Sequence, residues 1–218
     1  LDEDTQERAL DCLGRFAQRI AGIPRGSVRV VGTNTLRQAR NAREFIDRAE
    51  AVLGHDIEIV AGREEARLIY LGVAHSLADD AGQRLVVDIG GGSTELIIGE
   101  RFESTETESL HMGCVSFAQR FFTEGTITEK AFDRAVTAAR QEVLSIHANY
   151  RRLGWQQAVG ASGTIKAISQ VCVDNGWSET GITMEGLKKA RKKVIKAGQV
   201  EQLDIKGLRE DRKAIFPS

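Results

Sequence analysis

The sequence predicts an α/β protein in which mixed sheets are flanked by helices. Short segments with the alternation typical of strands are interspersed with longer segments that have apolar residues at helical spacing. In addition, residues 84–100 contain two apolar runs on either side of three consecutive glycines, which predicts a hairpin of two strands. A hairpin among strand–helix–strand units makes the expected sheet mixed, with parallel and antiparallel pairs.

Composition sets the broad class of the protein. The 218 residues suffice for one large domain or two small ones, and 41% hydrophobic with 28% charged residues is typical of soluble globular proteins. No apolar run reaches the roughly 20 residues of a membrane helix. The net charge of −1 argues against a general nucleic-acid-binding protein. Cys12, Cys114 and Cys172 have no paired spacing, which favours reduced thiols in a cytosolic protein.

Each predicted element follows from its local pattern. Strands are expected over residues 27–33, 56–62, 84–89, 94–100, 104–113 and 155–160. Helices are expected over residues 3–20, 34–53, 63–77, 114–122, 128–154, 164–176 and 183–198. Thr128 has the residue type and position of an N-cap, with an acidic residue directly behind it.

The glycine turn is the densest chemical signal in the chain. It matches neither the P-loop pattern nor the dinucleotide fingerprint, because Glu95 stands where the third fingerprint glycine belongs. The N–H groups of Gly90–Gly92 can line up to bind an anion, and Ser93 and Thr94 add hydroxyl donors. Asp88 precedes the turn, where it can hold Mg²⁺ through water. The alternative is a plain hairpin turn with an incidental acid.

Two adjacent glutamates, Glu64 and Glu65, open the helix expected over 63–77. Acidic residues in a first turn usually complement the helix dipole, and this is the simpler interpretation. The functional interpretation makes one of them a general base for a water molecule that attacks a phosphate.

A third candidate site is the segment VVGTNTLRQAR, in which a helix is expected to begin near Arg37. Backbone donors at a helix start suit an oxyanion, and an arginine can bind it through two parallel hydrogen bonds. Ordinary capping by Thr33 or Thr35 explains the same residues equally well.

The segment AVGASGTIKAI is the fourth candidate, a strand end followed by small residues and a helix start. Ser162, Gly163 and Thr164 can face an anion there, with Lys166 beside them. Close packing of a helix on a strand through small residues is the alternative. Three turns able to bind an anion, together with a carboxylate pair, match the requirements of phosphoryl chemistry.

One further pattern is a run of basic residues near the C-terminal end. The segment LKKARKKVIK contains Lys188, Lys189, Arg191, Lys192, Lys193 and Lys196. A solvated helix face is the simpler interpretation, and a surface that binds a long polyanion is the functional one.

Four segments together resemble one family. AGREEARLIYLGV, VVDIGGGSTELIIGE, MGCVSFAQRFF and AVGASGTIKA, in this order and spacing, resemble the exopolyphosphatase / guanosine pentaphosphate phosphohydrolase family, closest to its proteobacterial exopolyphosphatases. The resemblance implies an actin-like ATPase (ribonuclease H-like) fold, with two domains around a cleft. Residues 1–68 would be part of the N-terminal domain and residues 69–218 the second domain.

The resemblance also implies roles for individual residues. Glu65 would be the catalytic base, and Arg37 would bind phosphate. Asp88 and the segment 90–93 would form a phosphate-binding loop, with Mg²⁺ held by Asp88 and Glu95. Ser162, Gly163, Thr164 and Lys166 would line the cleft from the second domain.

The implied function is an exopolyphosphatase that releases terminal phosphate from inorganic polyphosphate with Mg²⁺. A guanosine pentaphosphate phosphohydrolase, an actin-like kinase and a non-catalytic phosphate or nucleotide sensor are the alternatives. The family's first phosphate loop would precede Leu1, so the chain is expected to be a piece of a longer protein, with weak or no activity of its own. A cytoplasmic location, with peripheral attachment to the inner membrane as an alternative, a homodimer of the whole protein and no nucleic-acid partner are also expected.

Overall fold

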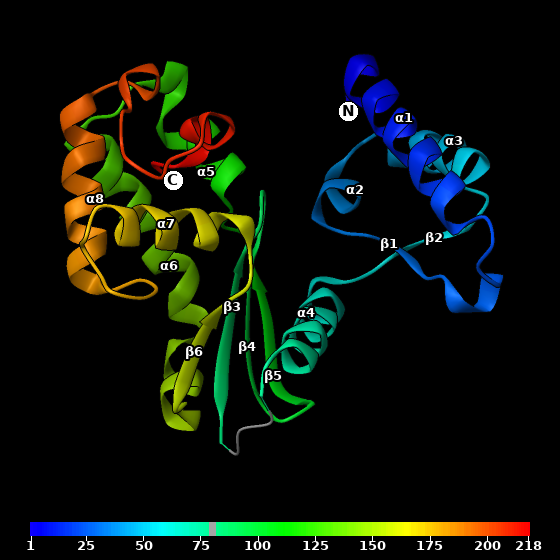
Figure 1. The fold of residues 1–218 in the computed structure, drawn as a ribbon, viewed down its shortest axis with the longest axis horizontal. Coiled ribbons are helices and arrows are strands. Elements are labelled where there is room, and N and C mark those ends of the chain that lie inside the picture. The colour runs from blue at the N-terminus through cyan, green and yellow to red at the C-terminus, as the bar shows by residue number, and fades with distance from the viewer. Residues whose placement is uncertain (79–81) are drawn as a thin grey trace. The chain divides into compact units, whose positions relative to one another are not determined.

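A computed structural model describes residues 1–78 and 82–218 (Figure 1). The chain forms two compact units, residues 1–65 and residues 66–218. Helices surround a four-stranded mixed sheet in the second unit, which confirms the predicted α/β class. The domain boundary expected at residue 68 and the boundary between the compact units both lie within helix α4 (Gly62–Ser76).

The first unit combines helices with a two-stranded parallel sheet. Strands β1 and β2 pair in parallel, with Val30 opposite Ile57. Helix α1 packs against helix α3. The elements of this unit are α1 (Glu3–Ile20), the 3₁₀ helix η1 (Arg25–Ser27), β1 (Val30–Gly32), α2 (Asn34–Gln38), α3 (Ala42–Leu53), β2 (Ile57–Ile59) and the first turn of α4.

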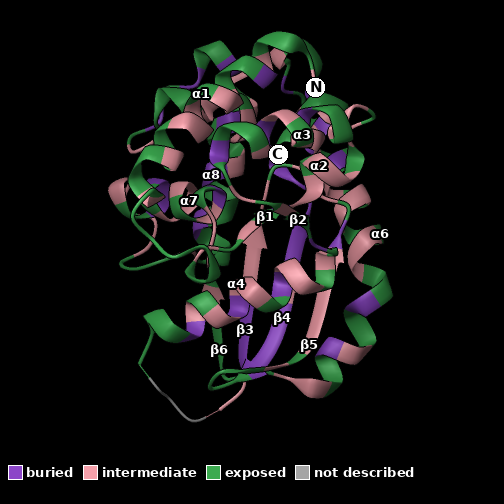
Figure 2. Cartoon of the chain, turned by 90° about the vertical axis from the view of Figure 1, so that its right-hand side faces the viewer, coloured by how far each residue is buried: buried purple, intermediate pink, exposed green. Residues whose placement is uncertain are grey.

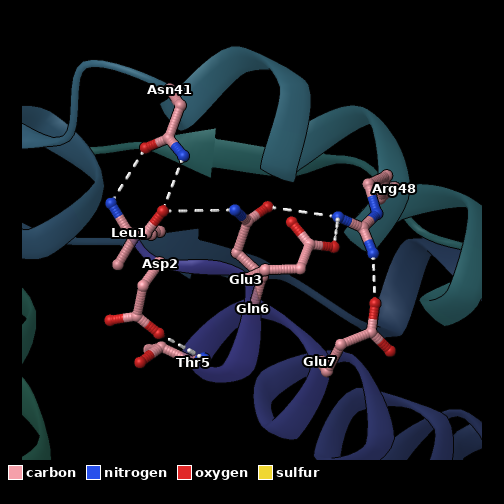
Figure 3. Close-up of polar contacts among 8 residues, drawn as sticks. All are labelled: Leu1, Asp2, Glu3, Thr5, Gln6, Glu7, Asn41 and Arg48. Carbon is pink, nitrogen blue, oxygen red and sulfur yellow. Dashed lines mark hydrogen bonds and ion pairs between the residues drawn. The ribbon is translucent and has the colours of Figure 1, made fainter.

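The single helix expected over residues 34–53 is wrong, because α2 and α3 are separate helices. Ala39 has an extended backbone (φ −71°, ψ 127°) that ends α2. Two residues later, Asn41 binds Leu1: its Oδ1 accepts a hydrogen bond from the Leu1 amino group at 3.0 Å, and its Nδ2 donates to the Leu1 carbonyl at 2.8 Å (Figure 3). The apolar periodicity on both sides of the break is helical, so the sequence pattern does not show it.

Arg48, which lies on α3, forms hydrogen bonds with residues of α1 (Figure 3). Its Nη1 donates to Glu3 at 3.0 Å and to the amide oxygen of Gln6 at 3.3 Å, and its Nη2 donates to Glu7 at 2.6 Å. Gln6, the buried residue of α1, also donates to the carbonyl of Leu1 at 3.2 Å. Hydrogen bonding, above all to Glu3, raises the pKa of the Arg48 guanidinium. Polar contacts therefore supply much of the α1–α3 interface.

The second unit is built on a sheet with the strand order β5–β4–β3–β6. The strands are β3 (Arg84–Ile89), β4 (Thr94–Glu100), β5 (Glu103–Leu110) and β6 (Gln157–Gly160). Strand β4 pairs antiparallel with β3 and β5, whereas β3 pairs in parallel with β6. The predicted glycine hairpin and the mixed sheet are therefore confirmed. Figure 2 shows buried residues along β4 in the middle of this sheet.

Helices cover both faces of the sheet. On one face, Tyr70 of α4 packs with Val86 and Ile97. On the other face, residues of α6 (Glu129–Leu153) pack with Leu85 and Ile98. Neighbouring residues of one strand point to opposite faces, so the two apolar runs supply both cores. This packing fixes the hairpin whose turn carries the candidate site.

The remaining elements form a helical layer around a third apolar cluster. They are α5 (Cys114–Phe121), α7 (Gly163–Asp174), α8 (Met184–Ala197) and the 3₁₀ helices η2 (Thr123–Gly125), η3 (Val200–Gln202) and η4 (Glu210–Ile215). Thr128 caps α6, since its side chain accepts a hydrogen bond from the Ala131 N–H at 3.1 Å, as predicted. Among the described residues, no helix has both the length and the apolarity needed to cross a membrane.

All three cysteines are free thiols, and they differ in burial. Cys172 is fully buried, and this burial raises the pKa of its thiol. Because the thiolate is the reactive form, we expect iodoacetamide at neutral pH to label the half-buried Cys12 and to leave Cys172 unlabelled until the chain unfolds. Peptide mass spectrometry before and after addition of denaturant measures both. Equal labelling in the native protein contradicts the expectation.

Candidate functional site

In the first unit, Glu65 is held by an arginine. It lies in the first turn of α4, and one of its side-chain oxygens, Oε2, accepts a hydrogen bond from Arg37 Nη1 at 3.0 Å. The same nitrogen donates to the carbonyl of Val60 at 2.7 Å. The side chains of Arg37 and Glu65 are only 20% and 15% exposed, so this ion pair is better shielded from water than a surface pair. The second oxygen, Oε1, has no partner among the described residues.

Arg37 does not lie at a helix start, so that expectation is wrong. Helix α2 begins at Asn34 and Arg37 lies in its last turn. Thr33 occupies the N-cap position, but its side chain makes no capping hydrogen bond. The arginine is directed at the carboxylate of Glu65 rather than placed beside free helix N–H groups. Its role as a phosphate ligand stays a prediction, and its contact with Glu65 is the observation.

The two adjacent glutamates of α4 have different surroundings. Glu64 lies 3.8 Å from Arg29, a residue that also binds Glu58 through two hydrogen bonds of 2.9 and 3.0 Å. Its side chain is 33% exposed, about twice the 15% of Glu65. Consecutive helical residues point about 100° apart, which separates the more exposed glutamate from the more shielded one. The geometry therefore distinguishes Glu65 from Glu64, and the role of Glu65 as the catalytic base stays a prediction.

In the second unit, the glycine turn joins β3 to β4. The Gly90 N–H donates to the Ser93 carbonyl at 2.9 Å, which closes the turn. This donor, predicted to bind phosphate, is therefore already used in the present conformation. The side chain of Ser93, predicted as a hydroxyl donor, is buried within the turn, at 3% exposure. The hydroxyl of Thr94 donates to the carbonyl of Met112 at 2.6 Å and is also used internally.

The start of α5 binds the carbonyl side of the glycine turn. Cys114 N–H donates to the Gly90 carbonyl at 2.9 Å, and the next two N–H groups donate to the Gly91 carbonyl at 2.9 and 3.0 Å. These bonds satisfy N–H groups that are otherwise free at a helix start. Every described peptide bond is trans, so each N–H points opposite to the carbonyl of its own peptide group. The N–H groups of Gly91 and Gly92 therefore point away from α5, and neither has an acceptor among the described residues.

Gly113 allows this contact between α5 and the turn. A Cβ at this position would lie 2.5 Å from backbone atoms of Gly91 and Gly92. Its backbone is extended (φ −148°, ψ 158°), so the requirement for glycine is steric rather than conformational. Sequence reasoning missed this role. The only signal was a glycine directly before a predicted helix, more than twenty residues after the turn that it contacts.

Asp88 and Glu95 are directly opposite each other in the β3–β4 register. Opposite residues of an antiparallel pair lie on one face, so the hairpin brings the two predicted metal ligands together. Glu95 is 1% exposed and accepts a hydrogen bond from the Ser109 hydroxyl at 2.8 Å. Asp88 is half-buried near the end of β3. In the described part of the chain, no three His, Cys, Asp or Glu side chains gather into a metal site.

This donor set fits Mg²⁺ only in part. Magnesium is usually held by one or two carboxylates together with water and substrate phosphate oxygens, so a protein cage is not required. Asp88, at the mouth of the glycine turn, fits that arrangement. Glu95 is enclosed in the sheet and hydrogen-bonded to Ser109, which suits a buried supporting role better than a direct ligand.

The fourth predicted segment lies at the start of α7. Ser162 is the N-cap, and its Oγ accepts hydrogen bonds from the N–H groups of Ile165 at 3.3 Å and Ile89 at 3.2 Å. Thr164 is buried, with its hydroxyl 3.4 Å from the sulfur of Cys114. The hydroxyls of Ser162 and Thr164 thus form hydrogen bonds within the protein, and their role in binding an anion stays a prediction. Lys166 is exposed.

Arg212 is a second residue that sequence reasoning missed. Its Nη2 lies 2.8 Å from the position that a Cβ on Gly163 would occupy, so η4 brings a guanidinium against the start of α7. The start of a helix carries partial positive charge, and a cation beside it is favourable when an anion binds both. Arg212 and Gly163 are far apart in sequence and belong to no motif, so no local pattern indicated their contact.

The whole chain, residues 1–218, matches the Ppx/GppA phosphatase family. A guanosine-5'-triphosphate,3'-diphosphate pyrophosphatase of Vibrio cholerae serotype O1 is 47% identical over 218 residues, which are 100% of this chain and 44% of that protein. The protein with the same name from Aliivibrio fischeri is 45% identical over the same shares. The chain thus spans less than half the length of these relatives.

Solved structures agree with this match. An exopolyphosphatase-like protein is similar with a TM-score of 0.84 and 26% identity, over 100% of this chain and 70% of that one. The Ppx/GppA family member of Aquifex aeolicus gives a TM-score of 0.74 and 26% identity, over 100% and 71%. These similarities confirm the fold that the sequence motifs implied, the actin-like fold of these enzymes. The chain belongs to the Ppx/GppA phosphatase family.

Proposed function

We propose that the protein hydrolyses the terminal phosphoanhydride bond of guanosine pentaphosphate, with water as the nucleophile. The observation that carries the proposal is the shielded Arg37–Glu65 pair at the start of α4, a carboxylate held in place with one oxygen unengaged. The two relatives named for this activity are 47% and 45% identical to the chain, whereas the exopolyphosphatase-like structure is 26% identical. This difference favours guanosine pentaphosphate over the polyphosphate expected from the sequence motifs.

Glu65 acts as the general base in this proposal. Arg37 fixes Oε2 and, through its bond to the Val60 carbonyl, fixes its own position relative to the start of α4. Oε1 is then the oxygen that accepts a proton from the attacking water. A base of this kind contributes about 10²–10⁴-fold to the rate. The arginine acts as a positioning residue, because its contact is with the base.

Within the second unit, a separate set of groups is proposed to bind phosphate. The N–H groups of Gly91 and Gly92 are directed away from α5 and bind an oxyanion without any change of the turn. Arg212, beside Gly163, adds a positive charge at the start of α7. Asp88 would hold Mg²⁺ together with phosphate oxygens, and the ion would supply neutralisation of the charge that develops on the phosphoryl group.

Substrate competition tests this proposal. Phosphate release from guanosine pentaphosphate and from long-chain polyphosphate should be measured with Mg²⁺, for this chain and for the longer protein that contains it. We expect a higher kcat/KM for guanosine pentaphosphate in the longer protein, and loss of release when EDTA removes the metal. A higher kcat/KM for polyphosphate would instead support the exopolyphosphatase interpretation. Absence of release from both substrates contradicts the hydrolase itself and leaves a phosphate or nucleotide sensor.

A further inference from the structure

The second unit contains an apolar cavity that the proposed hydrolysis does not use. It has a volume of about 450 Å³ and lies among helices α5, α6, α7 and α8 and residues 216–218 (Figure 1). Aliphatic and aromatic side chains form most of its wall, among them Phe132, Ile168, Leu187 and Phe216. Small-molecule sites typically have volumes of about 300–1,000 Å³ and mostly apolar walls with a few polar groups. The cavity has the size and the lining of such a site.

The charged residues of the cavity wall are all basic. They are Arg140 of α6 together with Lys188 and Arg191 of α8, and none of the described residues that line the cavity is acidic. The whole chain, by contrast, has a net charge of −1. Arg140 and Lys188 form no ion pair with any residue that the structure describes. Cations beside a low-dielectric wall focus a positive potential into the cavity, so its occupant is expected to be an anion.

Arg191 has a hydrogen-bond donor without an acceptor. Its Nη2 donates to Asp133 at 2.6 Å, and its Cζ lies 5.1 Å from the centroid of the Phe132 ring. Its Nε is buried and has no hydrogen-bond partner in the part of the chain that the structure describes. A buried donor without an acceptor is unfavourable. An anionic group in the cavity would supply the acceptor that this donor lacks.

The uncharged part of the ligand is expected to be aliphatic. Among the described residues of the wall, Ser218 has the only hydroxyl, and its Oγ already donates to the Cys114 carbonyl at 2.7 Å. Recognition of a nucleobase requires several donors and acceptors placed along its edge, and this wall supplies none that is uncharged and available. A base would therefore bury its own polar groups without partners, whereas a hydrocarbon chain has none to satisfy.

We propose that this cavity binds a monomeric aliphatic carboxylate, such as a medium-chain fatty acid. The hydrocarbon tail lies against the apolar wall, and the carboxylate is bound by Arg140, Lys188 and Arg191. Arginine suits this role because its planar guanidinium binds a carboxylate through two parallel hydrogen bonds. None of the residues that carry the proposed hydrolysis lines the cavity. The proposal therefore goes beyond the proposed function and does not depend on it.

Isothermal titration calorimetry with sodium hexanoate, octanoate and decanoate tests this site, at concentrations below micelle formation. The protein is the longer one that contains this chain. The test variant is Arg140→Gln/Lys188→Gln. The matched control, Arg151→Gln/Lys193→Gln, removes one charge from each of the same two helices, at exposed residues that do not line the cavity. Glutamine keeps nearly the helix propensity of arginine and lysine, so both variants should fold.

We expect the affinity of the wild type to rise about fourfold for each added methylene group, because each one is removed from water on binding. The test variant should lose roughly tenfold in affinity for decanoate and keep the same increase per methylene. The matched control should stay within about twofold of the wild type, since exposed charges contribute little. Decyltrimethylammonium, a cation with the same tail, should bind roughly tenfold more weakly than decanoate or less.

Several results overturn the proposal. Absence of decanoate binding means that another part of the longer protein, or a second copy of it, covers the cavity. Equal losses in the test variant and the control, or an unchanged test variant, exclude Arg140 and Lys188 as the groups that bind the carboxylate. An affinity that does not depend on chain length excludes the apolar wall as the site of the tail. Binding to vesicles of phosphatidylglycerol without binding to free decanoate excludes a monomeric ligand and indicates a membrane surface.

Discussion

Glu65→Gln is expected to lower the rate of phosphate release by about 10²–10⁴-fold, because a neutral amide cannot take a proton from water. The substitution keeps the size of the side chain, and the amide oxygen can still accept the hydrogen bond from Arg37. Binding of substrate should therefore persist while turnover is lost. The measurement is kcat and KM for phosphate release by the longer protein that contains this chain, with guanosine pentaphosphate and Mg²⁺.

Glu64→Gln is the matched control. It removes the same charge one residue earlier on α4, from a side chain that is 33% exposed and faces Arg29 at 3.8 Å. We expect the rate to change by less than about twofold, because partly exposed ion pairs contribute only about 0–1 kcal/mol to stability and the proposed base is Glu65. If Glu65→Gln keeps its rate, Glu65 only complements the helix dipole and the mechanism must be abandoned. Equal losses of rate in Glu65→Gln and Glu64→Gln indicate that negative charge at the start of α4 affects the rate, without a general base.

Sequence patterns predicted the elements that depend on residues close together in the chain. The two apolar runs in residues 84–100 predicted the hairpin, and the pairing of its strands places Asp88 opposite Glu95. Thr128 was predicted as an N-cap because capping depends on the few residues that follow it. The break between α2 and α3 was not predicted. Asn41 binds Leu1, forty residues away in the sequence, and a periodicity window does not include such a contact.

In the candidate site, too, sequence patterns predicted features that depend on nearby residues and missed contacts between residues far apart in the chain. Motifs identified the glycine turn and the start of α7 as candidate anion-binding sites, but not which donors are available. Backbone contacts decide this: Gly90 N–H closes its own turn, and Ser162 caps α7 and bonds to the end of β3. Arg212 reaches Gly163 from η4, through a contact that no spacing encodes. Residue types thus predicted where the candidate site lies, and tertiary hydrogen bonds determine its geometry.

Gly113→Ala is expected to lower the stability of the second unit. The new Cβ would lie 2.5 Å from backbone atoms of the glycine turn, which cannot rotate away as a flexible side chain can. Overpacking of this kind typically destabilises a protein by about 1–3 kcal/mol. Separation of α5 from the turn also removes the acceptors of its first N–H groups and frees the Gly90 and Gly91 carbonyls. The orientation of the Gly91 and Gly92 N–H groups, and with it phosphate binding, should be lost.

Gly72→Ala is a control substitution that is expected to raise the stability of the second unit. Gly72 lies within α4, and a Cβ there would meet no atom within 4 Å. Alanine in a helix is more favourable than glycine by about 0.5–1 kcal/mol, so this variant should be stabilised. Both tryptophans, Trp155 and Trp177, belong to the second unit, so tryptophan fluorescence during urea unfolding reports that unit alone. A Gly113→Ala midpoint equal to that of the wild type means that α5 does not hold the turn, and phosphate binding must then depend on Arg212 and the start of α7.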